Sequence, residues 1–242
     1  MTLPTSLQPL AGAFLAGLQR VLSSKLVGVY IYGAAVFPDG GVVQDVDFHV
    51  IVAAELAESE QQALQDLHVE LAQAFPGQGD DMDGYYLLLS EARRLEAPQH
   101  QFLTLRDESW ALHCAHIRAG RSCTVFGPDP LSIYPQPTWK ALDLALQGEL
   151  AFLQKEIERY PAYAVLNLSR LLYSYATKDV VISKQAAAAW AQVQYPAWAD
   201  LIEAALASYA KKATAEQRAL LADQARVYYC FVGGWLARFR AE

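Results

Sequence analysis

Apolar residues in the first 53 positions change from a helical to a strand-like spacing. Between residues 7 and 22 they recur every three or four residues, which predicts an amphipathic helix. Residues 27–32 are rich in β-branched and aromatic side chains and end at Gly33, as a strand does. Residues 46–53 repeat this composition after the turn-forming residues 37–41. The pattern predicts a helix followed by a hairpin with a long loop.

The rest of the chain divides into a mixed part and a helical part. A helix, a strand, a short helix and a strand are predicted, in that order, over residues 55–75, 82–90, 110–120 and 122–126. Beyond Trp139, helices are predicted over residues 138–159, 161–177, 183–194, 196–210 and 214–240. Two prolines within residues 134–137 are typical of a linker. We therefore expect an α/β domain over residues 1–135 and an all-α domain over residues 136–242.

The net charge, the apolar runs and the cysteine count of the chain limit which partners and which compartment we expect for it. The formal net charge is −7, which disfavours bulk nucleic acid and anionic membranes as partners. The helical spacing of residues 7–22, with no basic residues before it, indicates an amphipathic helix rather than a signal peptide, and no apolar run reaches the ~20 residues that span a bilayer. Three cysteines without metal-site spacing favour a reducing cytoplasm. The oligomeric state cannot be predicted.

Two carboxylates interrupt the second predicted strand. Asp45 and Asp47 are two residues apart, so their side chains share one face, while Val46 and Phe48 face the core. Two ionised carboxylates at this spacing repel each other unless a cation lies between them. Mg²⁺ fits, because it prefers oxygen ligands and is commonly held by one or two carboxylates with substrate phosphates. His49 falls on the same face and is a candidate to line the site.

The end of the first strand offers a complementary phosphate site. Gly33 and Ala34 lie about a dozen residues before the carboxylates, where backbone N–H groups can approach a phosphate closely. Such a site usually recruits a third acidic group, and Asp83 at the third strand is the candidate. Asp80 and Asp81 are the open alternatives.

Two basic residues of the helical part are candidates for anion contacts. Arg170 is the only charged residue between Tyr160 and Lys178, so we expect it to be half-buried beside an anion or in an internal salt bridge. Ser183 is a good N-cap, which places Lys184 in the first turn of a helix, where backbone N–H groups also attract anions. His113 and His116 lie three apart on one predicted helix, and we expect a structural role for them.

Two segments carry a resemblance to known enzymes. YGAAVFPDGGVVQDVDFHV resembles the signature of the nucleotidyltransferase superfamily typified by DNA polymerase beta, and AVLNLSRLLYSYATKDVVISKQAAAAWA resembles the helical domain of the aminoglycoside adenylyltransferases that modify streptomycin and spectinomycin. The resemblance implies an α/β (α+β) nucleotidyltransferase domain with a mixed sheet and an all-α helical bundle domain. It also implies ATP as co-substrate, Mg²⁺ on Asp45, Asp47 and Asp83, and transfer of AMP to a hydroxyl of a small acceptor such as an aminoglycoside.

The same resemblance assigns further residues. It places Gly33, Ala34 and Gln44 at the nucleotide phosphates. It also implies that Arg170, Lys184 and Tyr229 contact the nucleotide. For Tyr229 the alternative is a role in core packing. The acceptor region offers Glu149, Glu156 and Glu158, and we take Glu156 and Glu158 as candidates for binding a polycation.

Two departures from the family pattern keep rival functions open. Ala34 and Gln44 stand where the family has serine, so two hydroxyl contacts are lost while the backbone donors remain. One alternative is therefore a catalytically degenerate module that binds nucleotide or acts as a sensor. Another is a nucleotidyltransferase that acts on a protein or RNA acceptor.

Overall fold

The computed structural model describes residues 2–37 and 45–241, and the side chains up to residue 239. Gln44, predicted as a nucleotide contact, lies outside the described residues. The chain forms two compact units, which comprise residues 2–37 with 45–141 and residues 142–241 of the described chain. The division falls within one helix, α5 (Trp139–Glu156), and the domain ranges 1–135 and 136–242 stay predictions.

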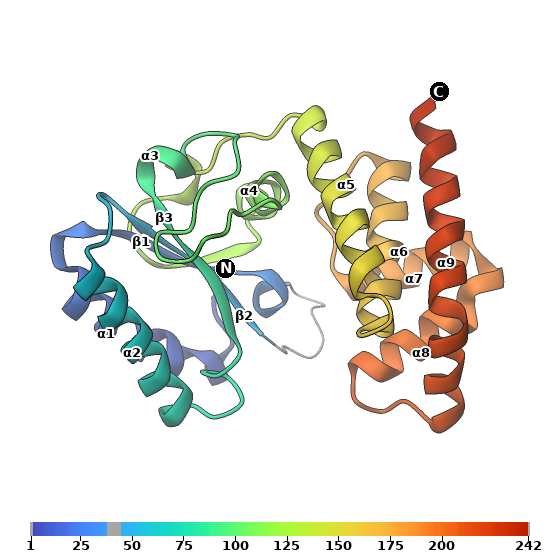
Figure 1. The fold of residues 1–242 in the computed structure, drawn as a ribbon, viewed down its shortest axis with the longest axis horizontal. Helices are drawn as coiled ribbons and strands as arrows, with labels where there is room; N and C mark the ends of the chain where they lie inside the picture. Colours follow the sequence, from blue (N-terminus) through green and yellow to red (C-terminus); the bar gives the residue numbers. More distant parts are fainter. Residues whose placement is uncertain (1, 38–44, 242) are drawn as a thin grey trace. The chain divides into compact units, whose positions relative to one another are not determined.

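The first unit contains a four-stranded sheet with helices on both faces (Figure 1). Its elements are α1 (Gln8–Leu22), β1 (Leu26–Tyr32), β2 (Val46–Val52), α2 (Glu58–Ala74), β3 (Met82–Leu88), α3 (Leu89–Ala92), α4 (Trp110–Arg118) and β4 (Ser122–Phe126). The strand order is β3-β2-β1-β4. β1 pairs antiparallel with β2 and β4, whereas β2 and β3 are parallel. The predicted hairpin and mixed sheet are confirmed.

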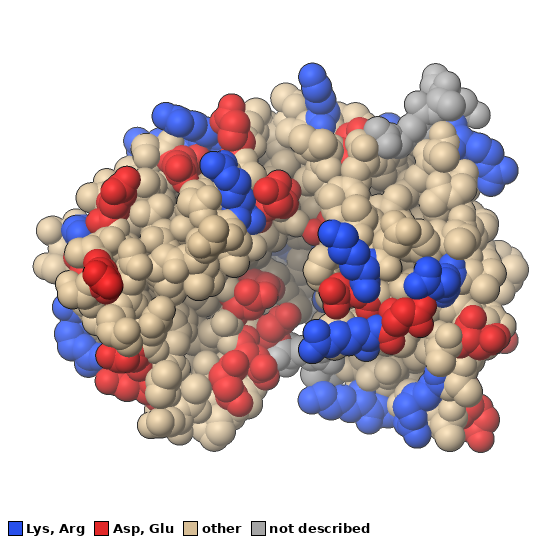
Figure 2. Space-filling view, viewed as in Figure 1, with Lys and Arg blue, Asp and Glu red and all other residues tan. Residues whose placement is uncertain are grey.

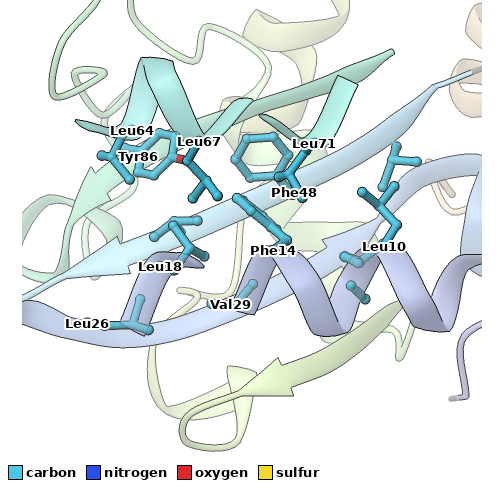
Figure 3. Close-up of a cluster of buried hydrophobic side chains, with 14 of the residues drawn as sticks. Leu10, Phe14, Leu18, Leu26, Val29, Phe48, Leu64, Leu67, Leu71 and Tyr86 are labelled. Atoms are coloured by element: carbon cyan, nitrogen blue, oxygen red, sulfur yellow. The ribbon is translucent and has the colours of Figure 1, made fainter. Parts of the chain in front are cut away.

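The core on one face of the sheet explains why α1 and α2 form. Leu10, Phe14 and Leu18 of α1 meet Leu64, Leu67 and Leu71 of α2 over the inward side chains of the strands (Figure 3). All six are buried, and their spacing of three or four residues places them on one side of each helix. Val46 and Phe48 of β2 join this core, as predicted. The alternate residues of β2 therefore face the opposite side.

A cross-strand pair fixes the register of β2 against β3. Phe48 pairs with Gly84, and a Cβ on Gly84 would overlap the backbone oxygen and the ring of Phe48. Any larger residue at this position would force the two strands apart. The same register places Asp47 opposite Asp83 and His49 opposite Tyr85.

The second unit is a helical bundle. Its helices are α5 (Trp139–Glu156), α6 (Pro161–Thr177), α7 (Lys184–Gln194), α8 (Ala199–Tyr209) and α9 (Ala215–Ala241). α6 is the most buried, and its Ser169 lies 3.1 Å from the Tyr228 hydroxyl of α9. Each predicted helix is present with ends shifted by a few residues. No helix in the described part of the chain is long and apolar enough to cross a membrane.

Candidate active site

A row of polar side chains crosses the sheet on the face opposite α1 and α2. Asp47 of β2 pairs with Tyr32 of β1 on one side and with Asp83 of β3 on the other. Neighbouring strands lie about 4.8 Å apart, so the two carboxylate-bearing residues are direct neighbours. The parallel pairing of β2 and β3 thus brings together two of the three predicted carboxylates, although they are 36 positions apart in the sequence.

Gly33 lies directly against the Asp47 carboxylate. It begins a short 3-10 turn (Gly33–Val36) with a φ of +71°, and a Cβ at this position would overlap Oδ2 of Asp47. Only glycine combines this backbone conformation with this close approach. Ala34 is the next residue of the turn and is half-buried. The predicted phosphate-binding turn and the predicted carboxylate are therefore in contact.

Asp45 supplies the third carboxylate of the group. Asp45 lies immediately before β2. The pKa of Asp83 is raised: burial is the larger cause, and the negative charge of Asp45 adds to it. Figure 2 shows acidic side chains gathering on the first unit over the region where β2 begins.

The two alternative carboxylates have other roles. The Asp80 side chain accepts a hydrogen bond of 2.6 Å from the backbone N–H of Gly77, which shapes the turn after α2. Asp81 uses its backbone oxygen to accept from Val46 N–H at the start of the β2–β3 pairing. Asp83 alone among the three lies in register with Asp47, so the geometry favours it as the third carboxylate.

A buried His–Asp–His cluster lies next to the aspartates, and sequence reasoning missed most of it. His49 follows Asp47 by two residues on the same face of β2 and is completely buried. Its Nε2 lies 3.6 Å from Oδ2 of Asp107, which precedes α4, and Nδ1 of His113 on α4 lies 2.7 Å from the same oxygen. His116 instead stacks edge-on against Phe37.

Burial and charge set the protonation of this cluster. Burial lowers the pKa of His49 to about 4, so its ring is neutral at pH 7. Burial disfavours the ionised form of Asp107, but His113 and His49 more than offset this and lower its pKa below the usual range. Burial, followed by the charges of Asp47 and Asp107, raises the pKa of Tyr32 well above its ordinary value. Asp107 is therefore ionised beside a neutral His49.

The two predicted cations of the second unit are placed on helices as expected. Arg170 of α6 is half-buried, and its Nη1 donates to Oδ1 of Asn167 at 3.3 Å. Ser183 caps α7 by accepting from Ala186 N–H at 3.0 Å, which leaves Lys184 as the first helical residue. Nζ of Lys184 donates to the Tyr209 hydroxyl at 3.0 Å.

The remaining predicted residues lie on the surface of the helical unit. Tyr229 of α9 is partly exposed, and its hydroxyl donates to Oε1 of Gln154 at 3.3 Å. Glu156 ends α5 and is half-buried, whereas Glu158 is exposed and forms an ion pair of 2.8 Å with Arg226. Tyr229 is thus not a core residue; the buried tyrosine of this turn is its neighbour Tyr228.

Comparisons with known proteins agree with this architecture. Residues 139–230 match the aminoglycoside adenylyltransferase C-terminal domain family. The fold matches the crystal structure of spectinomycin adenyltransferase AAD(9) from Enterococcus faecialis with ATP and spectinomycin, with a TM-score of 0.75 and 14% identity over 93% of this chain and 98% of that chain. A search of curated proteins gave no significant match.

A second solved structure matches with a low TM-score. The tri-AMPylated Shewanella oneidensis HEPN toxin in complex with MNT antitoxin matches at 14% identity over 62% of this chain and 91% of that chain, and its TM-score of 0.30 is too low to show a common architecture. The evidence for the fold is therefore the similarity to AAD(9), and the family match is confined to residues 139–230. Residues 139–230 thus match an aminoglycoside adenylyltransferase C-terminal domain, and the chain as a whole shares the fold of AAD(9).

Proposed function

We propose that this protein is a Mg²⁺-dependent nucleotidyltransferase that moves the AMP group of ATP to a hydroxyl of a small cationic acceptor, of which an aminoglycoside is the best candidate. The observation that supports it most is the registered pair Asp47 and Asp83, with Gly33 against the Asp47 carboxylate. The match of residues 139–230 to an aminoglycoside adenylyltransferase domain supports the choice of acceptor.

The carboxylates fit a magnesium ion. Asp45, Asp47 and Asp83 offer hard oxygen donors on one edge of the sheet, and the raised pKa of Asp83 reflects burial and repulsion from Asp45 that a cation relieves. Asp45, Asp47 and Asp83 would hold the ion. When bound, Mg²⁺ would neutralise charge on the phosphates of ATP.

Asp83 has a second proposed role as the general base. Burial, the largest cause of its raised pKa, brings this pKa closer to the working pH of a base. Asp83 accepts the proton of the acceptor hydroxyl, and the hydroxyl oxygen forms a bond to the α-phosphorus of ATP. The bond from that phosphorus to the bridging oxygen breaks, and pyrophosphate leaves.

Backbone and cationic donors complete the nucleotide contacts in this proposal. The N–H groups of Gly33 and Ala34 donate to phosphate oxygens, as turns with a positive φ commonly do. Arg170 and Lys184 of the second unit, together with Tyr229, are the proposed contacts of that unit to the nucleotide. Nζ of Lys184 donates to the Tyr209 hydroxyl at 3.0 Å and lies over the rings of Tyr163 and Tyr209.

Acidic residues suit a polycationic acceptor. Glu156 and Glu158 are the proposed contacts, and binding by Glu158 would require exchange of its partner Arg226. Because this ion pair is exposed, its loss costs little. The free cysteines Cys114, Cys123 and Cys230 fit the reducing cytoplasm that we propose as the place of the reaction.

Ala34 favours one alternative function, a degenerate module that binds nucleotide without turnover. The test is to incubate the protein with ATP, Mg²⁺ and a panel of aminoglycosides, and to measure pyrophosphate release beside Asp45→Asn. Release that depends on the acceptor and is lost in Asp45→Asn supports the enzyme. ATP binding with no release for any acceptor would sink it, and release only with a protein or RNA acceptor would reassign the substrate.

A further inference from the structure

The cluster of His49, Asp107 and His113 is a group of metal-ligating side chains that the proposed transfer reaction does not use. Each residue offers one ligand atom, and these atoms all lie within 4.8 Å of one another. The three come from different elements, β2, the segment before α4, and α4 itself. The sheet and the helix packed on it therefore assemble the cluster, and no short sequence motif contains it.

Two atoms of this cluster are buried without a hydrogen-bond partner in the described structure. These are Nε2 of His49 and Oδ1 of Asp107. The separation of 3.6 Å between His49 Nε2 and Asp107 Oδ2 is too long for a good hydrogen bond. Buried polar atoms are nearly always paired, so two unpaired atoms on neighbouring side chains of one cluster favour a ligand that both side chains can bind.

The surroundings orient His49 as a ligand. Its Nδ1 lies 3.2 Å from the hydroxyl of Tyr134, which is itself buried. This contact holds the ring and directs Nε2 towards Asp107. A hydrogen bond at one ring nitrogen that fixes the other on a metal is a general feature of histidine metal sites.

We propose that His49, Asp107 and His113 bind a divalent transition-metal ion, for which Zn²⁺ is the best fit. Two imidazoles and a carboxylate suit zinc, cobalt or nickel, whereas magnesium prefers oxygen ligands alone. Bonds of about 2.1 Å in tetrahedral geometry separate ligand atoms by about 3.4 Å. The observed separations of 2.7 and 3.6 Å lie on either side of that value.

The proposed ion replaces the hydrogen bond between His113 and Asp107. His113 is the accessible member, since 24% of its side chain is exposed, compared with 0% for His49 and 1% for Asp107. Metal can therefore reach the cluster from the His113 side. Three protein ligands leave one position for water or another small ligand, and binding ties α4 to β2.

The test uses the full-length protein after treatment with a chelator. Zn²⁺ binding is measured by equilibrium dialysis, and Co²⁺ binding by its visible absorption, both with excess Mg²⁺ present to occupy the aspartates. We expect one ion per chain, a cobalt spectrum of nitrogen and oxygen ligands, and a higher thermal midpoint with Zn²⁺. His113→Gln, at the partly exposed position, is expected to weaken binding at least about tenfold.

Matched variants make the result specific. His68→Gln changes a histidine that packs against Phe14 and Phe48 on the opposite face, and Asp45→Asn changes the proposed magnesium site. Both are expected to bind Zn²⁺ as the wild type does. The proposal is overturned if the wild type binds no Zn²⁺ or Co²⁺, if His113→Gln and a folded His49→Gln bind normally, or if Asp45→Asn abolishes binding. A thiolate charge-transfer band in the cobalt spectrum, which would assign the ion to a cysteine, also overturns it.

Discussion

Gly33 and the Asp47 carboxylate are in such close contact that no side chain fits between them. The φ of +71° at Gly33 adds a conformational requirement to this steric one. The position of the Asp47 carboxylate on β2 therefore depends on glycine at position 33, in the turn after β1.

Gly33→Ala is expected to destabilise the protein by about 1–3 kcal/mol and to abolish ATP binding, because the new methyl group displaces Asp47. Urea unfolding and calorimetric titration with ATP and Mg²⁺ measure the two effects. Gly120→Ala is the matched control: its φ is +77°, and nothing lies within 4 Å of the added Cβ. It should lose about 1 kcal/mol and bind ATP normally. Equal behaviour of the two variants would contradict the proposed role of Gly33.

Ala34→Ser is expected to tighten ATP binding. The added hydroxyl supplies a hydrogen bond to phosphate worth about 0.5–1.5 kcal/mol, which corresponds to about two- to tenfold in affinity. Ala35→Ser places a hydroxyl one residue later, at a buried position, and should weaken folding without a gain in affinity. Unchanged ATP affinity in Ala34→Ser would place the phosphates elsewhere.

Asp83→Asn is expected to have opposite effects on turnover and stability. It removes the proposed base and a metal ligand, so pyrophosphate release should fall below detection. In the absence of Mg²⁺ it also removes repulsion from Asp45, and the free energy of unfolding should rise by about 0.5 kcal/mol. Because the pKa of Asp83 is raised on folding, this gain should be present at neutral pH and vanish in acid, where the carboxyl is protonated. A variant that is less stable without metal would argue against a strained carboxylate group.

Lys184→Met is expected to weaken ATP binding about tenfold or more, because a donor to the phosphates is lost while the apolar stem remains. In the free protein, Nζ of Lys184 donates to a hydroxyl and lies over two aromatic rings. Lys178→Met is the control, because this lysine also lies over an aromatic ring, that of Phe239 at 4.5 Å, but is not a proposed nucleotide contact. Isothermal titration with ATP separates the two variants, and similar affinities would remove Lys184 from the site.

Stability is expected to fall between pH 6.5 and pH 4 because of two buried histidines, His49 and His100, and His100 is the one that can be tested away from the site. Its Nδ1 accepts hydrogen bonds from the N–H groups of Phe102 and Leu103, both at 3.1 Å, so the folded protein requires the neutral ring. Burial lowers the pKa of His100 to about 4. The unfolded chain therefore takes up a proton that the folded one does not, and stability present above pH 6.5 is lost in acid, on the order of 3 kcal/mol.

His100→Asn tests this origin of the acid sensitivity. The amide oxygen of asparagine can accept the same two N–H bonds without titrating, so the variant should fold at pH 7 and show a shallower loss of stability towards pH 4. Urea unfolding across this range makes the comparison. An equally steep loss in the variant would show that other groups carry the effect.

The sequence predicted the elements far better than it predicted their contacts. The spacing of apolar residues and the turn-forming residues located β1, β2 and α1. The spacing of Asp45 and Asp47 pointed to a carboxylate site. Asp107 gave no such signal, because it lies in an irregular segment and owes its place to His49 and His113 from two other elements. The same limit applies to His113, whose spacing from His116 predicted a shared structural role although the two side chains meet different partners.

The short helix α3 and the contacts of Asp80 and Asp81 could not be predicted from the sequence either. α3 has only four residues and no periodicity to detect. The choice among the three aspartates required the parallel register of β2 and β3, which depends on contacts between residues far apart in sequence. The sequence had already favoured Asp83 over Asp80 and Asp81, and the strand pairing adds that Asp83 lies opposite Asp47.

The Phe48–Gly84 pair links catalytic alignment to the helices on the far side of the sheet. A slip of β3 by one residue would place Met82 or Gly84 opposite Asp47 and turn Asp83 towards the core of α1 and α2. Glycine at position 84 is what allows the ring of Phe48 to occupy its place. Two residues with no proposed chemical role thus set the spacing of the proposed catalytic carboxylates across β2 and β3.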